Sequence, residues 1–246
     1  MQDWNERTYL LLGREAADTL ATTHVMIVGV GGVGAYAAEM IARAGVGRIT
    51  IVDGDVVSPS NINRQLPALH STIGLDKVAV MQQRIADINP EAKVEALKMF
   101  ITPDSVNRLL VAKPDFVIDA IDSISPKVAL IEHCLREGIN IISSMGAGGR
   151  LDPTAVRYAD ISQTHNDGLA RVVRTRLRKD GFHKGLTVVW SEEPATEASL
   201  IFTDGELPCK RSSYGTVSYL PCIFGCMLAA HAINKLKKND RSKKHK

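Results

Sequence analysis

The chain is 246 residues long, which is enough for one large α/β domain or two small ones. Hydrophobic residues make up 45% of it and charged residues 23%, and this balance excludes a disordered, collagen-like or coiled-coil chain. The formal net charge of +3 is unevenly divided, because residues 1–156 carry 14 Lys/Arg against 18 Asp/Glu and residues 157–246 carry 16 against 9.

The first two-thirds of the chain alternate short apolar runs with helical patterns. Two of the helices are introduced by an N-cap residue followed by proline, Thr102-Pro103 and Ser125-Pro126. Strands with continuous apolar cores that alternate with helices indicate a parallel sheet covered on both faces. The sequence therefore predicts a Rossmann-like, doubly wound and mostly parallel α/β sheet, whose ligand crevice lies beyond the carboxyl ends of the strands. The predicted strands are 25–28, 48–52, 94–99, 116–120 and 139–143, and the predicted helices are 34–44, 75–88, 102–110 and 125–138.

After residue 149 the pattern weakens to strands at 155–158 and 186–190, a helix at 169–178 and a long loop at 191–215. The apolar stretch 217–233 contains Ser218, Pro221 and His231, so we expect a buried C-terminal helix and no integral membrane association. The expected organisation is an ATP-binding core with an N-terminal helix at 1–155, a C-terminal substrate and dimer portion of the same fold at 156–234, and a disordered basic tail at 235–246.

The cysteine content bears on compartment and on metal binding. The four cysteines are too few and too irregularly spaced for a disulfide scaffold, and no apolar signal segment precedes them, so a reducing cytoplasm is expected. No Cys-x-x-Cys pair occurs, which excludes a four-thiolate zinc site built from paired knuckles.

A glycine-rich loop, Gly29-Val30-Gly31-Gly32-Val33-Gly34, follows the first predicted strand and opens a helix. Glycines at these positions permit a tight turn and let a phosphate approach the helix N–H groups. Asp53 ends the next strand, where it is placed to hydrogen-bond a ribose hydroxyl. The loop alone fits ATP as well as a nicotinamide or flavin dinucleotide, so a dinucleotide-dependent oxidoreductase or redox sensor stays open at this point.

Two cations behind this loop favour phosphate transfer chemistry. Arg64 is followed 13 residues later by Lys77. Hydride transfer has no need of such cations, whereas an enzyme that expels pyrophosphate needs them to stabilise the charge on the leaving oxygens. Asp122, just past the strand at 116–120, offers a hard oxygen ligand for Mg²⁺.

These motifs, in this order, resemble those of the ubiquitin-activating-type adenylating enzymes, the family that includes MoeB and ThiF. The resemblance covers about residues 5–145 and implies ATP binding, an Mg²⁺ ion bridging the phosphates, and a homodimer in which Arg7 reaches across to the phosphates. Catalytic roles are expected for Arg64, Lys77, Asp122 and Arg7. The residues expected to bind ATP are Gly29, Gly31, Gly32, Gly34, Asp53, Asp55, Asn61, Asn63, Arg64, Gln65, Lys77, Asp122 and Ser123, and the family motif also includes Asp119.

The chain departs from MoeB and ThiF in ways that point to one branch of the family. The zinc-binding cysteine pairs are absent, and a cysteine that would accept a ubiquitin-like protein has no clear counterpart, although Cys209 lies in the corresponding region. Together with the segments 146–154 and 211–219, this resembles the branch of tRNA threonylcarbamoyladenosine dehydratases. The resemblance implies that ATP activates the carboxylate of the modified adenosine in tRNA by adenylation, after which the base closes to a cyclic form.

The alternative is the adenylation of the C-terminus of a sulfur-carrier protein, as by MoeB or ThiF, and the sequence leaves open whether a sulfur-transfer partner assists. Intramolecular closure of an activated carboxylate needs neither a cysteine relay nor a protein acceptor, which agrees with the residues that are missing. A basic cluster is expected to meet tRNA phosphates together with Lys210, Arg211 and the tail. Its members are Arg171, Arg174, Arg176, Arg178, Lys179 and Lys184.

Overall fold

The computed structural model describes residues 4–202 and 212–237. A seven-stranded sheet in the order β3-β2-β1-β4-β5-β7-β6 forms its centre, and neighbouring strands are parallel except β6 and β7. This confirms the doubly wound, mostly parallel sheet. The strands are β1 (His24–Val28), β2 (Arg48–Asp53), β3 (Lys93–Lys98), β4 (Phe116–Asp119), β5 (Asn140–Ser144), β6 (Val156–Asp160) and β7 (Thr187–Ser191), and β8 (Leu200–Phe202) pairs with β9 (Ser212–Tyr214) in a separate hairpin.

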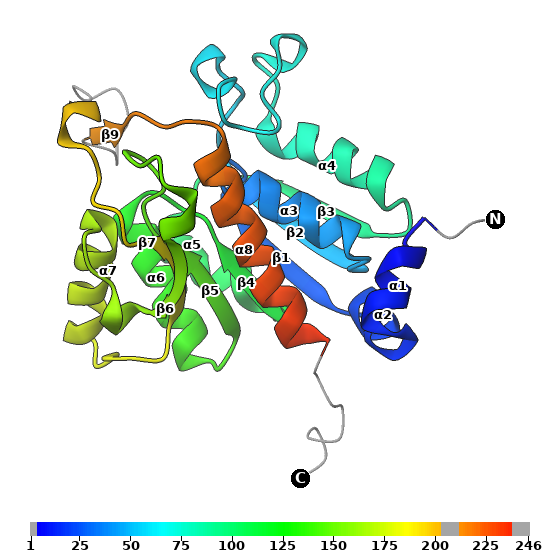
Figure 1. Ribbon diagram of the computed structural model, residues 1–246. Helices are drawn as coiled ribbons and strands as arrows, with labels where there is room; N and C mark the ends of the chain where they lie inside the picture. The colour runs from blue at the N-terminus through cyan, green and yellow to red at the C-terminus, as the bar shows by residue number, and fades with distance from the viewer. Residues whose placement is uncertain (1–3, 203–211, 238–246) are drawn as a thin grey trace.

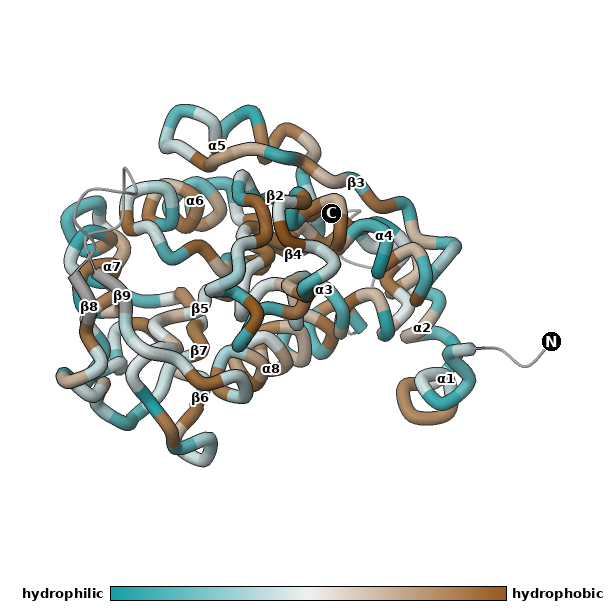
Figure 2. Tube along the Cα trace, turned by 90° about the horizontal axis from the view of Figure 1, so that it is seen from above, coloured by the Kyte–Doolittle hydropathy of each residue, from teal (hydrophilic) through white to brown (hydrophobic). Residues whose placement is uncertain are grey.

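Helices cover both faces of the sheet (Figure 1). The helices α3, α4 and α8 pack against one another on one face, and α5, α6 and α7 form a row on the other. Figure 2 shows this layering from above, with α5 and α6 on one side of the strands and α3 and α8 on the other. The helices are α1 (Glu6–Leu12), α2 (Arg14–Ala21), α3 (Gly34–Arg43), α4 (Lys77–Ile88), α5 (Pro103–Leu109), α6 (Ile124–Arg136), α7 (Gly168–Lys179) and α8 (Tyr219–Leu236).

The apolar strand runs are explained by burial on both faces. All five residues of β1 are buried. Val25 and Ile27 belong to the core under α3 and α8, and Met26 and Val28 belong to the core under α5 and α6. Alternate side chains of a strand point to opposite faces, so a central strand covered on both sides has to be apolar throughout.

The expected helix starts are correct at α5 and shifted at α6. Thr102 caps α5, because its hydroxyl accepts a hydrogen bond from the Ser105 amide at 3.3 Å. At α6 the expected cap, Ser125, instead lies inside the first turn, and Ser123 occupies the N-cap position. Pro126 is tolerated there because the first helical N–H groups have no partner within the helix, so its missing N–H removes no helical hydrogen bond.

Three segments differ in detail from the expectation. The N-terminal region forms two helices, separated at Gly13, where one was expected. The loop expected over 191–215 contains the strands of the β8–β9 hairpin, which are each three residues long and too short to give a periodic pattern. The C-terminal helix α8 runs to Leu236, so Lys235 and Leu236 belong to it and not to the expected tail. It is long and apolar enough to cross a membrane by composition alone, and 44% of it is buried in the protein.

Candidate functional site

The glycine loop lies between β1 and α3, where the order of the sheet reverses between β1 and β4. Ligand crevices of doubly wound sheets lie at such switch points. Gly29 has a φ of +88°, and a Cβ on it would lie 2.8 Å from the carbonyl oxygen of Ala120. A Cβ on Gly34 would lie 1.8 Å from the carbonyl oxygen of Gly29. Neither position accepts a side chain, so both glycines are required for the tight turn from strand to helix.

Asp53, at the end of β2, holds this loop in place. One carboxylate oxygen accepts a hydrogen bond from the amide of Val30 at 2.8 Å, and the other accepts one from the amide of Asp55 at 2.9 Å. Burial raises the pKa of Asp53, and the charge of Lys77 opposes this shift. The carboxylate expected to meet a ribose is therefore also a brace for the loop, and each of its oxygens retains a lone pair for a ligand.

Lys77 begins α4 and points to the same edge of the sheet. It is only 5% exposed, and its ammonium group lies 2.8 Å from a carboxylate oxygen of Asp55. The amide of Lys77 also donates to the carbonyl oxygen of Asp55, at 3.1 Å. The side chain of Asp55 is 49% exposed, so the ion pair joins the buried ammonium group of Lys77 to a carboxylate at the protein surface.

The turn around Arg64 lies against the glycine loop. A Cβ on Gly32 would lie 3.5 Å from Cγ of Arg64, and one on Gly31 would lie 3.6 Å from Nε2 of Gln65. The Oε1 atom of Gln65 is buried and has no hydrogen-bond partner within the described part of the chain. Asn61 has a structural role in this turn, because its Oδ1 accepts a hydrogen bond from the amide of Ser58 at 3.1 Å.

The Arg64 guanidinium connects the turn to two further elements. Its Nη1 donates to Oδ1 of Asn63 at 2.7 Å, and Nδ2 of Asn63 donates to the carbonyl oxygen of Thr216, just before α8, at 2.9 Å. Burial lowers the pKa of Arg64, and the negative charge of Asp122 opposes this shift. Arg64 and Asp122, which are far apart in the sequence, are therefore close enough to interact electrostatically.

Asp119, which was singled out as part of the family motif, is a buried support instead of a surface ligand. One of its oxygens lies 2.7 Å from the ammonium of Lys127 and 2.6 Å from the hydroxyl of Ser143, and both members of the ion pair have no exposed side-chain area. The other oxygen accepts the amide of Ile121 at 3.0 Å, which fixes the backbone leading to Asp122. The sequence reasoning missed Lys127, although a lysine on the apolar stripe of α6 needs a buried partner.

The remaining predicted residues are divided between the two edges of the sheet. Asp122 is exposed at the start of α6, and Ser123 is the N-cap residue of that helix. Arg7 is exposed on α1, which lies beside α2 and away from the glycine loop (Figure 1). Its neighbour Asn5 lies 3.3 Å from the position of a Cβ on Gly45, in the turn that leads into the amino end of β2. A single chain thus does not bring Arg7 to the other predicted site residues.

The geometry of this edge fits a nucleoside triphosphate. The glycine loop offers backbone without side chains, Arg64 and Lys77 supply positive charge beside it, and the buried Oε1 of Gln65 needs a partner. Within the described residues no group of three His, Cys, Asp or Glu side chains converges on one point. An Mg²⁺ ion held through Asp122 would thus take its other ligands from phosphates and water, as this ion commonly does.

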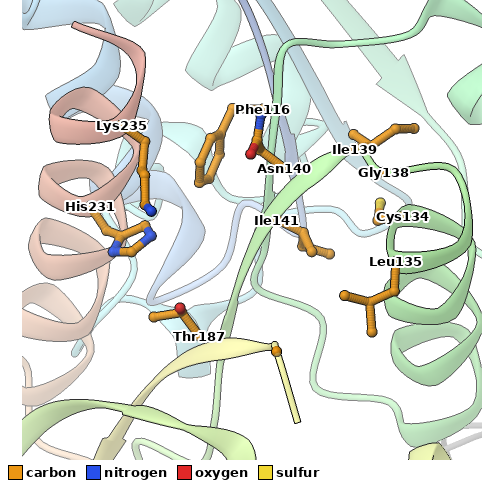
Figure 3. A pocket seen from close by; sticks show the side chains of 11 residues that line it. Phe116, Cys134, Leu135, Gly138, Ile139, Asn140, Ile141, Thr187, His231 and Lys235 are labelled. Carbon is orange, nitrogen blue, oxygen red and sulfur yellow. The ribbon is translucent and has the colours of Figure 1, made fainter. Parts of the chain in front are cut away.

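A separate cavity of about 220 Å³ opens at the opposite, amino edge of the sheet (Figure 3). Phe116, Asn140 and Thr187 line it at the starts of β4, β5 and β7, and His231 and Lys235 face it from α8. Burial and the charge of Lys235 lower the pKa of His231. None of the predicted site residues lines this cavity.

The expected basic cluster, most of which lies on α7, is only partly available to a ligand. Arg174 is half-buried and donates to the carbonyl oxygen of Thr164 at 2.9 Å, so it fastens α7 to the preceding loop. Arg176 is exposed and donates to the hydroxyl of Ser125 at 3.0 Å, in the first turn of α6. Cys209, Lys210 and Arg211 and residues 238–246 of the tail lie outside the described residues. The exposed members without a role in packing are Arg171, Arg178, Lys179 and Lys184.

Comparisons with known proteins agree with this geometry. The chain matches the ThiF family over residues 5–246. The tRNA threonylcarbamoyladenosine dehydratase of Bacillus subtilis is 42% identical, with 98% of this chain and 97% of that protein covered, and the enzyme of the same name from Escherichia coli is 38% identical, with 95% and 94% covered. A crystal structure of the Escherichia coli enzyme, TcdA, in complex with ATP has a TM-score of 0.85 and 37% identity, and covers 94% of this chain and 92% of that one.

Proposed function

This chain belongs to the ThiF family, and we propose that it is an ATP-dependent dehydratase that converts threonylcarbamoyladenosine in tRNA to its cyclic form. The observation that carries the proposal is the match, over nearly the full length of both proteins, to dehydratases that act on this nucleoside. The paired cations beside the glycine loop add independent support, because pyrophosphate release requires them. Activation of a sulfur-carrier protein is the weaker alternative, since the full-length relatives named above are dehydratases.

In the proposed reaction ATP is a substrate and the atoms balance in two steps. A carboxylate oxygen of the threonyl group attacks the α-phosphorus, and the bond to the bridging oxygen breaks with release of pyrophosphate. The ureido group of the same nucleoside then attacks the activated carbonyl carbon, AMP departs with the former carboxylate oxygen, and the ureido proton goes to solvent. The second step is intramolecular and benefits from a high effective concentration. The nucleoside loses the elements of one water.

Four of the predicted residues have direct roles in these steps. Arg64 and Lys77 stabilise the charge that develops on the leaving pyrophosphate, in a crevice where charges are poorly screened. Asp53 accepts a hydrogen bond from the ribose while it braces the glycine loop. Asp122 would hold Mg²⁺, which would supply positive charge to neutralise the phosphates.

We propose that no cysteine thioester takes part. Burial raises the pKa of Cys134 to about 12, and burial with the neighbouring Cys226 raises the pKa of Cys222 to about 11, so neither thiol supplies a thiolate near neutral pH. Cys226 is half-buried on α8. Cys209 is the cysteine in the region that corresponds to the family's acceptor cysteine, and Cys209→Ala tests it. Cyclisation at the rate of the unmodified chain is expected, whereas loss of cyclisation with ATP and tRNA binding intact would require a thioester.

We propose a homodimer in which Arg7 completes the site of the partner, because within one chain it lies apart from the glycine loop. Leu10 and Leu11, on the same short helix, are 80% and 83% exposed and would be covered in the dimer. Mixing Arg7→Ala with Arg64→Ala, each strongly impaired alone, is expected to restore activity, since each mixed dimer then holds one intact site. If mixing restores nothing while the separate variants stay impaired, Arg7 does not act across a dimer.

For the tRNA contact we propose the exposed basic residues of α7, Arg171, Arg178 and Lys179. Replacing all three with Gln is expected to weaken tRNA binding and to flatten its dependence on salt, because fewer counterions are released. An unchanged salt dependence would place the contact elsewhere. A cytoplasmic location follows from the proposed substrate, and a sulfur-transfer protein is a further partner that the family resemblance leaves open.

The purified protein, incubated with Mg²⁺ and tRNA that carries threonylcarbamoyladenosine, tests the function directly. Mass spectrometry of the digested tRNA is expected to show a nucleoside lighter by one water when ATP is present, and the unchanged nucleoside when ATP is omitted. If the nucleoside stays unchanged and pyrophosphate exchange instead depends on a sulfur-carrier protein, the alternative function is correct.

A further inference from the structure

A buried arginine joins three loops at the carboxyl edge of the sheet, beside the nucleotide crevice. Arg150 is 4% exposed, and its guanidinium donates to groups after β5, after β7 and before α7. Five of its hydrogen bonds end on the carbonyl oxygens of Gly146 (2.5 Å), Gly148 (3.1 Å), Glu193 (2.8 Å) and Asn166 (3.0 Å) and on the carboxylate of Asp167 (3.3 Å).

The charge of Arg150 is balanced within the protein. Asp167 is buried, forms the ion pair with Arg150, and accepts hydrogen bonds from the amides of Gly146 at 3.0 Å and Ala170 at 2.8 Å. The same carboxylate therefore caps α7 and holds the loop that follows β5. Only a planar guanidinium can serve this many acceptors in one plane, so a lysine would keep the ion pair and lose most of the other contacts.

The loop that Arg150 holds is packed between two other segments. A Cβ on Gly148 would lie 2.9 Å from Cβ of Tyr214, so the loop and β9 are in close contact. Gly149 donates its amide to the carbonyl oxygen of Gly215 at 2.8 Å and accepts the amide of Thr196 at 2.7 Å. The position of residues 146–149 thus determines where residues 214–216 lie.

Those residues lead directly to the phosphate side of the crevice. The carbonyl oxygen of Thr216 accepts a hydrogen bond from the side-chain Nδ2 of Asn63, and Oδ1 of the same side chain accepts one from the guanidinium of Arg64. A continuous series of contacts therefore runs from the buried Arg150 to the cation assigned to the leaving pyrophosphate.

We infer that Arg150 is a positioning residue: it sets the loops that receive the modified adenosine and, through Thr216 and Asn63, the orientation of Arg64 for adenylation. The inference rests on the proposed function for its chemistry and on the contacts above for its geometry. A displacement of about 1 Å at reacting groups can cost about 100-fold in rate, so a loosened support has a large effect on turnover.

The test compares Arg150→Lys and Arg150→Met with Arg157→Met, a neighbouring exposed arginine paired with Glu192. We expect kcat for cyclisation to fall about 100-fold in Arg150→Lys and further in Arg150→Met, with ATP affinity nearly unchanged, because the glycine loop, Asp53 and Lys77 do not contact Arg150. Arg157→Met is expected to keep the wild-type kcat. A role in stability alone would lower the melting temperature and leave the kcat of the folded Arg150→Lys protein unchanged.

Two further measurements separate this inference from the function on which it rests. The effects of Arg150→Lys and Asn63→Ala on kcat are expected to combine to less than their product, because both break the same series of contacts. Amide hydrogen exchange, which needs no activity, is expected to speed up at residues 146–149 and 214–216 in Arg150→Lys and to stay unchanged at residues 30–34. If the wild type fails to cyclise the nucleoside, the proposed function is wrong. If exchange at 214–216 does not respond, or if Arg150→Lys turns over like the wild type, the positioning role is wrong.

Discussion

The carboxyl edge of the sheet has two halves that are organised differently. In the nucleotide half, at the ends of β1, β2 and β4, polar side chains bind the backbone of the turns next to them, as Asp53 does with the amides of Val30 and Asp55. In the other half, at the ends of β5 and β7, which we propose receives the substrate and call the substrate half, three separate loops depend on one buried guanidinium. A rigid phosphate site can thus be built from local turns, whereas the second half depends on contacts between distant segments.

The largest effect is expected from removing the cation of the nucleotide half. Arg64→Ala should lower kcat/KM for cyclisation about 100- to 1000-fold, because a fixed positive group beside the leaving oxygens is lost. Steady-state kinetics with varied ATP measures this, and Arg108→Ala, an exposed arginine on α5, is the control. Equal losses in the two variants would contradict the assignment of Arg64 to the phosphates.

The second prediction concerns the buried ion pair between Asp119 and Lys127, which fixes the backbone that leads to Asp122 in the nucleotide half. Lys127→Met leaves the carboxylate of Asp119 buried without its counter-charge, and we expect the free energy of unfolding to fall by about 3–5 kcal/mol. Urea denaturation measures the change. Adding Asp119→Asn should recover part of it, since the buried charge is then removed. A loss no larger than that from replacing an exposed lysine such as Lys93 would show that the buried ion pair does not contribute to stability.

The third prediction tests the packing of the substrate half with two glycines that share a positive φ. Gly149 has a φ of +75°, and a Cβ on it would lie 3.0 Å from Cβ of Ala195, whereas Gly74 has a φ of +85° and no atom within 4 Å of such a Cβ. Gly74→Ala should cost only the backbone strain, about 1–2 kcal/mol, and Gly149→Ala should cost more in thermal denaturation because of the added contact. Equal losses of stability in the two variants would mean that the loop containing Gly149 shifts to accommodate the added methyl group.

The smallest effect on stability is expected at the contact between α6 and the C-terminal end of α7, and it depends on pH. Burial and a hydrogen bond with Asp180 raise the pKa of Glu132 from 4.5 to about 7, with Arg136 opposing the shift. The folded state therefore holds a proton that the unfolded state releases, so the free energy of unfolding decreases as the pH rises from about 4.5 to about 7. Glu132→Gln should flatten this slope in melting curves across that range. A slope unchanged by the substitution would exclude Glu132 as its source.

The two halves also differ in how far the sequence predicts them. The glycine loop, Asp53 and the Arg64–Lys77 spacing could be predicted because phosphate chemistry demands those residue types beside a strand end. The partners of Asp119 and Arg150 could not, because Lys127 and Asp167 are brought to them only by the packing of α6 and α7. The cap of α6 was displaced from Ser125 to Ser123 for a related reason, since a proline near the start of a helix fits more than one register.

The central claim, that the substrate carboxylate is adenylated, is tested most directly with a heavy-oxygen label in that carboxylate. The label is introduced through threonine when the modified tRNA is prepared, and the nucleotides formed during cyclisation are analysed by mass spectrometry. Adenylation predicts that each cyclised nucleoside transfers one labelled oxygen to the phosphate of AMP. Unlabelled AMP, or label in inorganic phosphate, would contradict the account.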